Sequence, residues 1–163
     1  MPSAPDQAGD LWTFATRAYA EPGVAEACLR LQDEAGADVC LLFAALWSAA
    51  CGPGLLGPED LDALDDLVAP WREQVVRPLR QARRWMKAAG HDPDPLRDRI
   101  KAAELAAEER ELATMARWLG RLPAPRPPGD PDRAAAILAG RLGCEPALLA
   151  PLARAAYACS RSR

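Results

Sequence analysis

The sequence contains few of the residues from which catalytic and metal sites are usually recognised. His91 is the only histidine among 163 residues. The five cysteines include no CxxC pair; they are Cys28, Cys40, Cys51, Cys144 and Cys159. A zinc site built from thiolates and imidazoles therefore lacks its usual spacing. The chain also has no glycine-rich phosphate loop, dinucleotide-binding fingerprint or recognisable nucleophile and base pair. We predict no metal and no cofactor, and the sequence leaves open whether the protein is an enzyme.

The chain also lacks an excess of one charge and a long hydrophobic run. Its 20 Lys and Arg residues nearly balance 23 Asp and Glu residues, for a formal net charge of -3, which disfavours nucleic-acid binding. The longest apolar run, residues 39–51, is too short to cross a bilayer. Residues 1–10 have neither the basic start nor the apolar core of a secretory signal. We expect a cytoplasmic protein without membrane association, whose cysteines are mostly small buried residues.

Three helices are predicted in the first third of the chain. Apolar residues recur at helical spacing in residues 11–19 and 24–35, and Asp10 fits an N-cap of the first helix. Gly36 is well placed to end the second helix. The third begins near Asp38, which fits its N-cap, and is apolar nearly all round. Such a helix belongs at the centre of a bundle.

Two long helices are predicted after a short acidic helix in residues 58–69. The first covers residues 70–89, and its expected buried face consists of Val68, Trp71, Val75, Leu79, Ala82 and Met86. Pro78 lies inside this helix, so we expect a lost hydrogen bond and a distortion near Gln74. The second covers residues 95–119. Because a short turn separates them, the two should form an antiparallel hairpin.

The order of residues in the first three helices resembles a known family. It consists of Leu-Trp, Phe-Ala, Tyr-Ala, Pro-Gly-Val-Ala, Ala-Cys-Leu, Leu-Gln-Asp, Gly, Asp-Val and a Leu-Leu-Phe run that ends at Trp47. Residues 11–118 are thereby similar to a conserved bacterial family of unknown function. An Asn often follows Asp-Val in that pattern, whereas this chain has Cys40. The resemblance implies an all-helical bacterial protein, and it supplies no reaction, cofactor or site residues.

The overall prediction is an all-α protein, a single bundle of about five helices with a C-terminal helical hairpin. We expect a disordered N-terminus in residues 1–9 and the core of the bundle in residues 10–119. Residues 120–131 are rich in proline and cannot continue a helix, so they predict a linker. The hairpin and a basic tail occupy residues 132–163. The hairpin either docks on the bundle or binds a partner.

Two rows of opposite charge lie on the predicted hairpin. The first helix carries Arg77, Arg80 and Arg84, and the second carries Glu104 and Glu108. Register counting places Arg80 near Glu104 and Arg77 near Glu108. The simpler interpretation is a set of solvent-exposed ion pairs, each worth about 0–1 kcal/mol. The alternative is that partly buried arginines face a cavity and bind a carboxylate or phosphate.

An acidic cluster lies between the second and third helices. Asp33 and Glu34 occupy the end of a helix, where negative charge is disfavoured by roughly 0.3–1 kcal/mol. One explanation is solvation or pairing with Arg30, and the other is contact with an arginine of the basic row. Under the second explanation, Asp33, Glu34 and Asp38 would join that row in a ligand pocket.

We therefore expect a non-enzymatic cytosolic accessory protein that interacts with an unidentified protein partner. The first alternative is a small-molecule binder or enzyme, in which the acidic cluster and the arginine row form a pocket for a small anionic metabolite. A weaker alternative is an RNA-associated protein that uses the arginine row and Trp85. The charged neighbours of Trp85 make this residue a candidate for an exposed partner surface, whereas Trp12, Trp47 and Trp71 are expected to be in the core.

Overall fold

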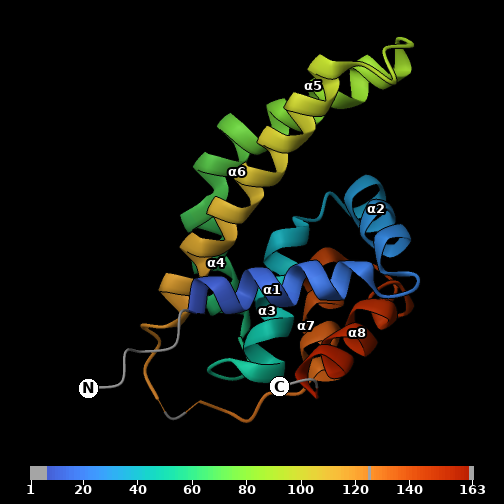
Figure 1. The fold of residues 1–163 in the computed structure, drawn as a ribbon. Helices are drawn as coiled ribbons and strands as arrows, with labels where there is room; N and C mark the ends of the chain where they lie inside the picture. The colour runs from blue at the N-terminus through green and yellow to red at the C-terminus, as the bar shows by residue number, and fades with distance from the viewer. Residues whose placement is uncertain (1–6, 125, 162–163) are drawn as a thin grey trace.

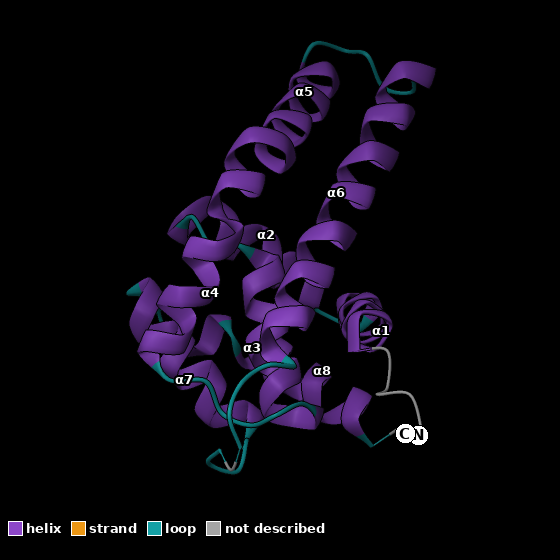
Figure 2. Cartoon of the chain, turned by 90° about the vertical axis from the view of Figure 1, so that its left-hand side faces the viewer, coloured by secondary structure: helices purple, strands orange, loops and turns teal. Residues whose placement is uncertain are grey.

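Helices are the only regular elements in the computed structural model, which describes residues 7–124 and 126–161 (Figures 1 and 2). The α-helices are α1 (Gln7–Ala20), α2 (Val24–Ala35), α3 (Val39–Cys51), α4 (Pro58–Trp71), α5 (Arg77–Ala88), α6 (Pro95–Leu119), α7 (Pro131–Leu142) and α8 (Ala150–Ser160). The predicted all-α bundle is confirmed. Within the described residues, we find no helix that combines the length and the apolar character needed to cross a membrane.

Helix α3 lies at the centre of the bundle. Residues 40–49 are all buried, which explains why this helix is apolar on every side. Asp38 is its N-cap, because the carboxylate accepts a hydrogen bond of 2.9 Å from the backbone N–H of Cys40. Helices α1, α6, α7 and α8 all pack against α3. The prediction of a central apolar helix capped by Asp38 is therefore confirmed.

The start of α1 differs from the prediction. The helix begins at Gln7, so Asp10 lies in its first turn and is not its N-cap. Residues 7–9 are helical, and the prediction of a disordered N-terminus is wrong for them; the rest of that prediction falls on residues 1–6, which lie outside the described residues. Because an acidic residue is favourable anywhere in the first turn of a helix, the position of Asp10 does not determine the residue at which α1 begins.

Helices α4 and α5 form one continuous helical rod. They are joined by η1 (Arg72–Val76), a π-helical segment, and not by the new start that we predicted at Pro70. The proline ring of Pro78 removes one backbone donor and crowds the preceding turn, and a π-type widening relieves such crowding. A distortion was predicted near Gln74, and the π segment includes this residue.

The rod and α6 form an antiparallel hairpin, as predicted, and its far end extends away from the other helices (Figures 1 and 2). We call residues 77–105 the arm; they comprise α5, the turn and the first part of α6. Helix α5 contains no buried residue. The prediction that Leu79, Ala82 and Met86 continue the buried face is wrong, because at this distance from α3 only α6 is available to cover them.

The C-terminal hairpin docks on the bundle. It consists of α7, the 3-10 turn η2 (Pro146–Leu148) and α8, and its Leu138 and Leu152 belong to the same hydrophobic core as α3. The proline-rich segment before it passes close to α3. A side chain at Gly129 would place its Cβ atom 2.1 Å from the carbonyl oxygen of Ala49, so only glycine allows this approach.

Candidate functional site

Two arginines and two glutamates connect α5 and α6 at the base of the arm. The guanidinium of Arg80 donates to Glu104 at 3.0 Å and to Glu108 at 2.6 Å. Arg83 also binds Glu104, with one contact of 3.1 Å. We call Arg80, Arg83, Glu104 and Glu108 the charged ladder. The predicted proximity of Arg80 to Glu104 is confirmed.

The two glutamates of the ladder have pKa values displaced in opposite directions. Burial is the largest effect on both carboxyl groups and raises the pKa. At Glu104, hydrogen bonds from Arg83 and Arg80 outweigh burial, and the pKa is lowered. At Glu108, Arg80 only partly offsets burial, and the pKa is raised. Glu104 is thus the more strongly held anion of the two.

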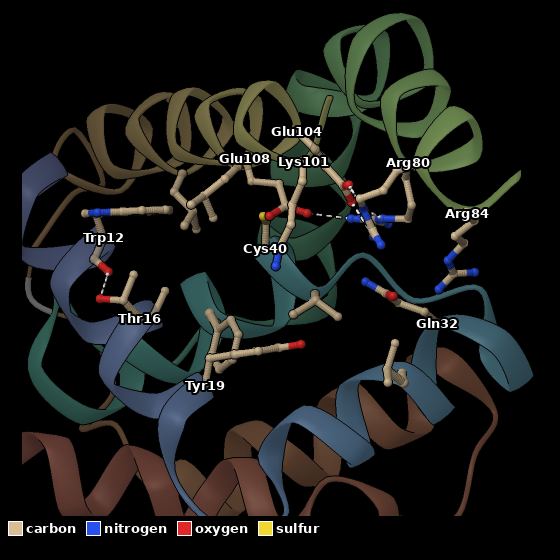
Figure 3. A pocket seen from close by; sticks show the side chains of 17 residues that line it. Trp12, Thr16, Tyr19, Gln32, Cys40, Arg80, Arg84, Lys101, Glu104 and Glu108 are labelled. Atoms are coloured by element: carbon tan, nitrogen blue, oxygen red, sulfur yellow. Dashed lines mark hydrogen bonds and ion pairs between the residues drawn. The ribbon is translucent and has the colours of Figure 1, made fainter. Parts of the chain in front are cut away.

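A cleft of about 440 Å³ lies beside the ladder, within the range of small-molecule sites (Figure 3). Its walls come from five helices, and most of the wall surface is apolar. The residues that line the cleft include Trp12, Ala15, Thr16, Tyr19, Leu29, Gln32, Cys40, Phe43, Arg80, Arg83, Arg84, Lys101, Glu104, Leu105 and Glu108. The sequence pattern singled out Arg80, Arg84, Glu104 and Glu108, but not Arg83, Lys101 or the contribution of α1. No local pattern marks those residues, since tertiary packing alone brings α1 opposite α6.

The predicted acidic cluster does not form one site. Glu34 binds Arg30 on its own helix at 2.9 Å, and both side chains are exposed. Asp33 contacts Arg84 at 3.2 Å, and this pair is also exposed, with 60% and 44% of the side chains accessible. Asp38 instead faces the interior. The three carboxylates thus have different partners, and Asp33 alone makes the predicted contact with an arginine of the basic row.

The predicted arginine row is also divided. Arg77 binds Glu73 at 3.0 Å on the same rod and does not contact Glu108, so that predicted pair is wrong. Arg80 and Arg84 line the cleft, whereas Arg77 does not. Arg80 binds both Glu104 and Glu108, and Arg77, one turn closer to the body, pairs along its own rod instead.

A buried ionic network lies where η1 and α6 meet the start of α3. The guanidinium of Arg72 donates to Asp38 at 2.9 Å and to Asp65 at 2.6 Å. Only 12% of the Arg72 side chain is exposed. Burial is the largest effect on this arginine and lowers its pKa, but the bonds to Asp38 and Asp65 together raise it above its ordinary value. Arg72 therefore neutralises two carboxylates from different parts of the body, the N-cap of α3 and the middle of α4.

Glu111 lies against this network beside Asp38, where no described residue donates a hydrogen bond to its carboxylate. The residue is 1% exposed. Burial, followed by the charge of Asp38, raises its pKa well above the ordinary value. Glu111 continues the acidic row of Glu104 and Glu108 along α6. Nothing in the sequence distinguishes it as a buried member of that row.

Asp38, Cys40 and Glu111 are the described residues whose potential metal-ligand atoms approach within 4.8 Å of one another. Their chemistry does not favour a cation. Arg72 already supplies positive charge to Asp38, and burial raises the pKa of the Cys40 thiol well above its ordinary value. A metal would be bound by the thiolate of Cys40, and burial disfavours the loss of the proton that forms this thiolate. This group is better explained as part of the interior network.

Comparison with protein families identifies the larger part of the chain. Residues 10–115 match a family model described as "Protein of unknown function (DUF2390)". The match covers α1 to most of α6, and so includes the ladder, the cleft and the interior network. The chain belongs to this family, which agrees with the resemblance noted in its sequence. Neither a curated protein nor a solved structure matches the chain.

Proposed function

We propose that this member of the DUF2390 family is a non-enzymatic bacterial accessory protein whose arm binds a protein partner in the cytoplasm. The observation that carries the proposal is Trp85. This residue lies on the arm, beyond the bundle, with 67% of its surface exposed. Exposed tryptophan is uncommon on a surface that binds nothing, and tryptophan is enriched at the energetic centres of protein interfaces.

The surroundings of Trp85 also favour a partner surface. Its ring stacks on His91 from the turn, with ring centroids 6.3 Å apart and an interplanar angle of 26°, so its orientation is partly fixed before binding. Leu96, across the same turn, is 56% exposed. Burial of these two side chains on a partner would remove apolar surface from water without changing the arm itself.

The charge of the arm suggests the chemistry of the partner. Residues 77–105 contain eight Lys and Arg and four Asp and Glu, whereas the rest of the chain contains twelve and nineteen. The arm is thus a basic projection from an acidic molecule. An acidic protein surface would be complementary to it. RNA is the less favoured partner, because Arg80 and Arg83 already bind glutamates of the same hairpin.

The cysteines support a cytoplasmic site of action. Cys28, Cys40, Cys144 and Cys159 are free thiols in the structure, and all of these but Cys144 are buried. Burial raises the pKa of the Cys28 thiol to about 12, which keeps the sulfur protonated and unreactive. Free thiols of this kind suit a reducing compartment.

The proposal is tested by photo-crosslinking in the native bacterium. A photoreactive phenylalanine analogue would replace Trp85 in one strain and Leu67 in another; Leu67 is exposed on α4, outside the arm. We expect a crosslink from position 85 to one acidic protein, and none to that protein from position 67. Trp85→Ala should abolish recovery of the same protein, while Leu67→Ala should not.

Three outcomes would contradict the proposal. Crosslinks from both positions to the same proteins would indicate nonspecific contact. A crosslink from position 85 that is sensitive to ribonuclease would indicate RNA as the partner. Unchanged recovery of the acidic protein by Trp85→Ala would show that the arm is not its binding surface.

A further inference from the structure

We infer that the cleft beside the charged ladder binds a single-chain amphipathic anion, with an unbranched hydrocarbon tail and a carboxylate or phosphate at one end. The cleft is asymmetric. Trp12 and Thr16 of α1 lie toward one end, and Gln32, Arg80 and Arg84 lie toward the other (Figure 3). An elongated ligand with two chemically different ends fits this arrangement.

The tail would lie against the apolar wall. Phe43 and Ala15 are almost fully buried beneath the cleft, while Leu29 and Leu105 are about half exposed along it. Half-exposed leucines beside a hollow are costly to leave in water, and a hydrocarbon chain would cover them. A strongly polar ligand such as a sugar would leave its hydroxyl groups without partners on these walls.

The charge of the lining favours an anion. Four basic side chains line the cleft, and only two acidic ones do. Both acids, Glu104 and Glu108, are already bound by Arg80. Lys101 forms no ion pair within the described part of the chain, and its ammonium group is therefore available to a ligand. The three arginines already pair with acidic side chains, so Lys101 is the cation of the lining that remains to bind a carboxylate or phosphate.

Other polar groups of the cleft are also without protein partners. The side-chain amide of Gln32, the hydroxyl of Tyr19 and the indole N–H of Trp12 make no side-chain hydrogen bond to any residue that the structure describes. These groups are distributed along the cleft and not gathered at one rim. Gln32, at the arginine end, is placed to orient a ligand head, whereas Tyr19 and Trp12 lie farther along the cleft and can bind water.

Isothermal titration of the full chain tests the inference with four probes. Decanoate and decyl phosphate are kept below their critical micelle concentrations. We expect decanoate, decyl phosphate or both to bind with one molecule per chain. Decanol has the same tail without the charge and should bind at least about tenfold more weakly, because charge-assisted hydrogen bonds contribute roughly 1.5–3 kcal/mol. Inorganic phosphate, the head without the tail, should give no measurable heat. The relative affinities of decanoate and decyl phosphate identify the preferred head group.

Two matched pairs of variants locate the binding. Thr16→Phe fills the cleft from α1, whereas Thr13→Phe adds the same side chain at an exposed position of that helix outside the cleft. Lys101→Met removes a positive charge from the lining, and Lys87→Met removes one elsewhere on the arm. We expect the first member of each pair to weaken binding by about tenfold or more and the second to leave it unchanged.

The inference is overturned if decanol binds as tightly as both anions, or if none of the tailed probes binds. It is also overturned if Thr13→Phe and Lys87→Met weaken binding as much as their partners, since that result would indicate detergent-like association with the surface. Thermal melting by circular dichroism shows that each variant is folded. Partner crosslinking at Trp85 is measured separately, so failure of one proposal leaves the other standing.

Discussion

The body of the protein and its arm are built from helices of different character and are stabilised differently. Helix α3 is apolar on every side and ten of its thirteen residues are buried, whereas α5 is amphipathic and contains no buried residue. Helix α3 is surrounded by α1, α6, α7 and α8, while α5 packs mainly on α6. An apolar side chain becomes part of a core only where enough helices surround it. On the arm, the apolar stripe of α5 therefore remains partly accessible and is available for binding.

The ionic contacts show the same contrast along one continuous rod. Arg72, in η1, is 12% exposed and bridges two carboxylates of the body. Arg77, one turn further on, is 46% exposed and pairs within its own helix. Burial strengthens an ion pair once it is formed and makes an unpaired charge costly, so equal substitutions at these positions should have unequal effects.

The largest effect expected from a charged residue is that of Arg72→Ala. It leaves Asp38 and Asp65 without their shared cation in a partly buried site, and we expect a loss of about 3 kcal/mol in the free energy of unfolding. Arg77→Ala should cost less than about 0.5 kcal/mol. Urea unfolding of both variants measures the difference. Equal losses would mean that the body and the arm do not differ in the way the contacts indicate.

A stabilising effect is expected from Glu111→Gln. Because the pKa of Glu111 is raised, the folded protein keeps this group protonated while the unfolded chain ionises, and stability is lost as pH rises above the unfolded value of 4.5. An uncharged amide removes that loss. The variant should be more stable by roughly 1–3 kcal/mol near pH 8 and nearly unchanged near pH 5. Urea unfolding at the two pH values tests this, and a destabilised variant at pH 8 would contradict it.

Sequence analysis predicted the parts of the fold that depend on local pattern. The central helix, the N-cap Asp38, the hairpin of the rod and α6, and the pairing of Arg80 with Glu104 all follow from periodicity and register over short distances. A distortion near Gln74 was expected from Pro78, and the π segment includes that residue, although its type was not predicted. The extent of burial on α5 was missed because it depends on how far the rod extends beyond its neighbours.

The candidate site was less predictable for the same reason. Arg80, Arg84, Glu104 and Glu108 were chosen from spacing and do line the cleft. Asp33, Glu34 and Arg77 were also chosen from spacing, but each binds an exposed partner outside the cleft or at its edge. Spacing shows which residues share a helix face, and only the packing of helices distant in sequence decides whether that face is open, covered or buried.

A smaller effect of the opposite sign to that of Glu111 is expected at Glu104. Its pKa is lowered by Arg83 and Arg80, so its contribution is present above the unfolded value of 4.5 and is lost as pH falls through the folded value. Glu104→Gln should therefore destabilise the protein by about 1 kcal/mol at neutral pH and less in acid. Glu109→Gln, at an exposed position of the same helix, is the control. A Glu104 variant that unfolds like the control would show that the ladder does not stabilise the arm.

The smallest expected effect on stability is that of Trp85→Ala. The side chain is largely exposed and contacts mainly His91 of the turn, so its removal should change the free energy of unfolding by less than about 0.5 kcal/mol. Trp47→Ala, at a buried position of α3, should cost about 3–5 kcal/mol. Urea unfolding compares the two. A large loss of stability in Trp85→Ala would mean that this side chain stabilises the folded arm. A small loss would agree with a role of Trp85 in partner binding.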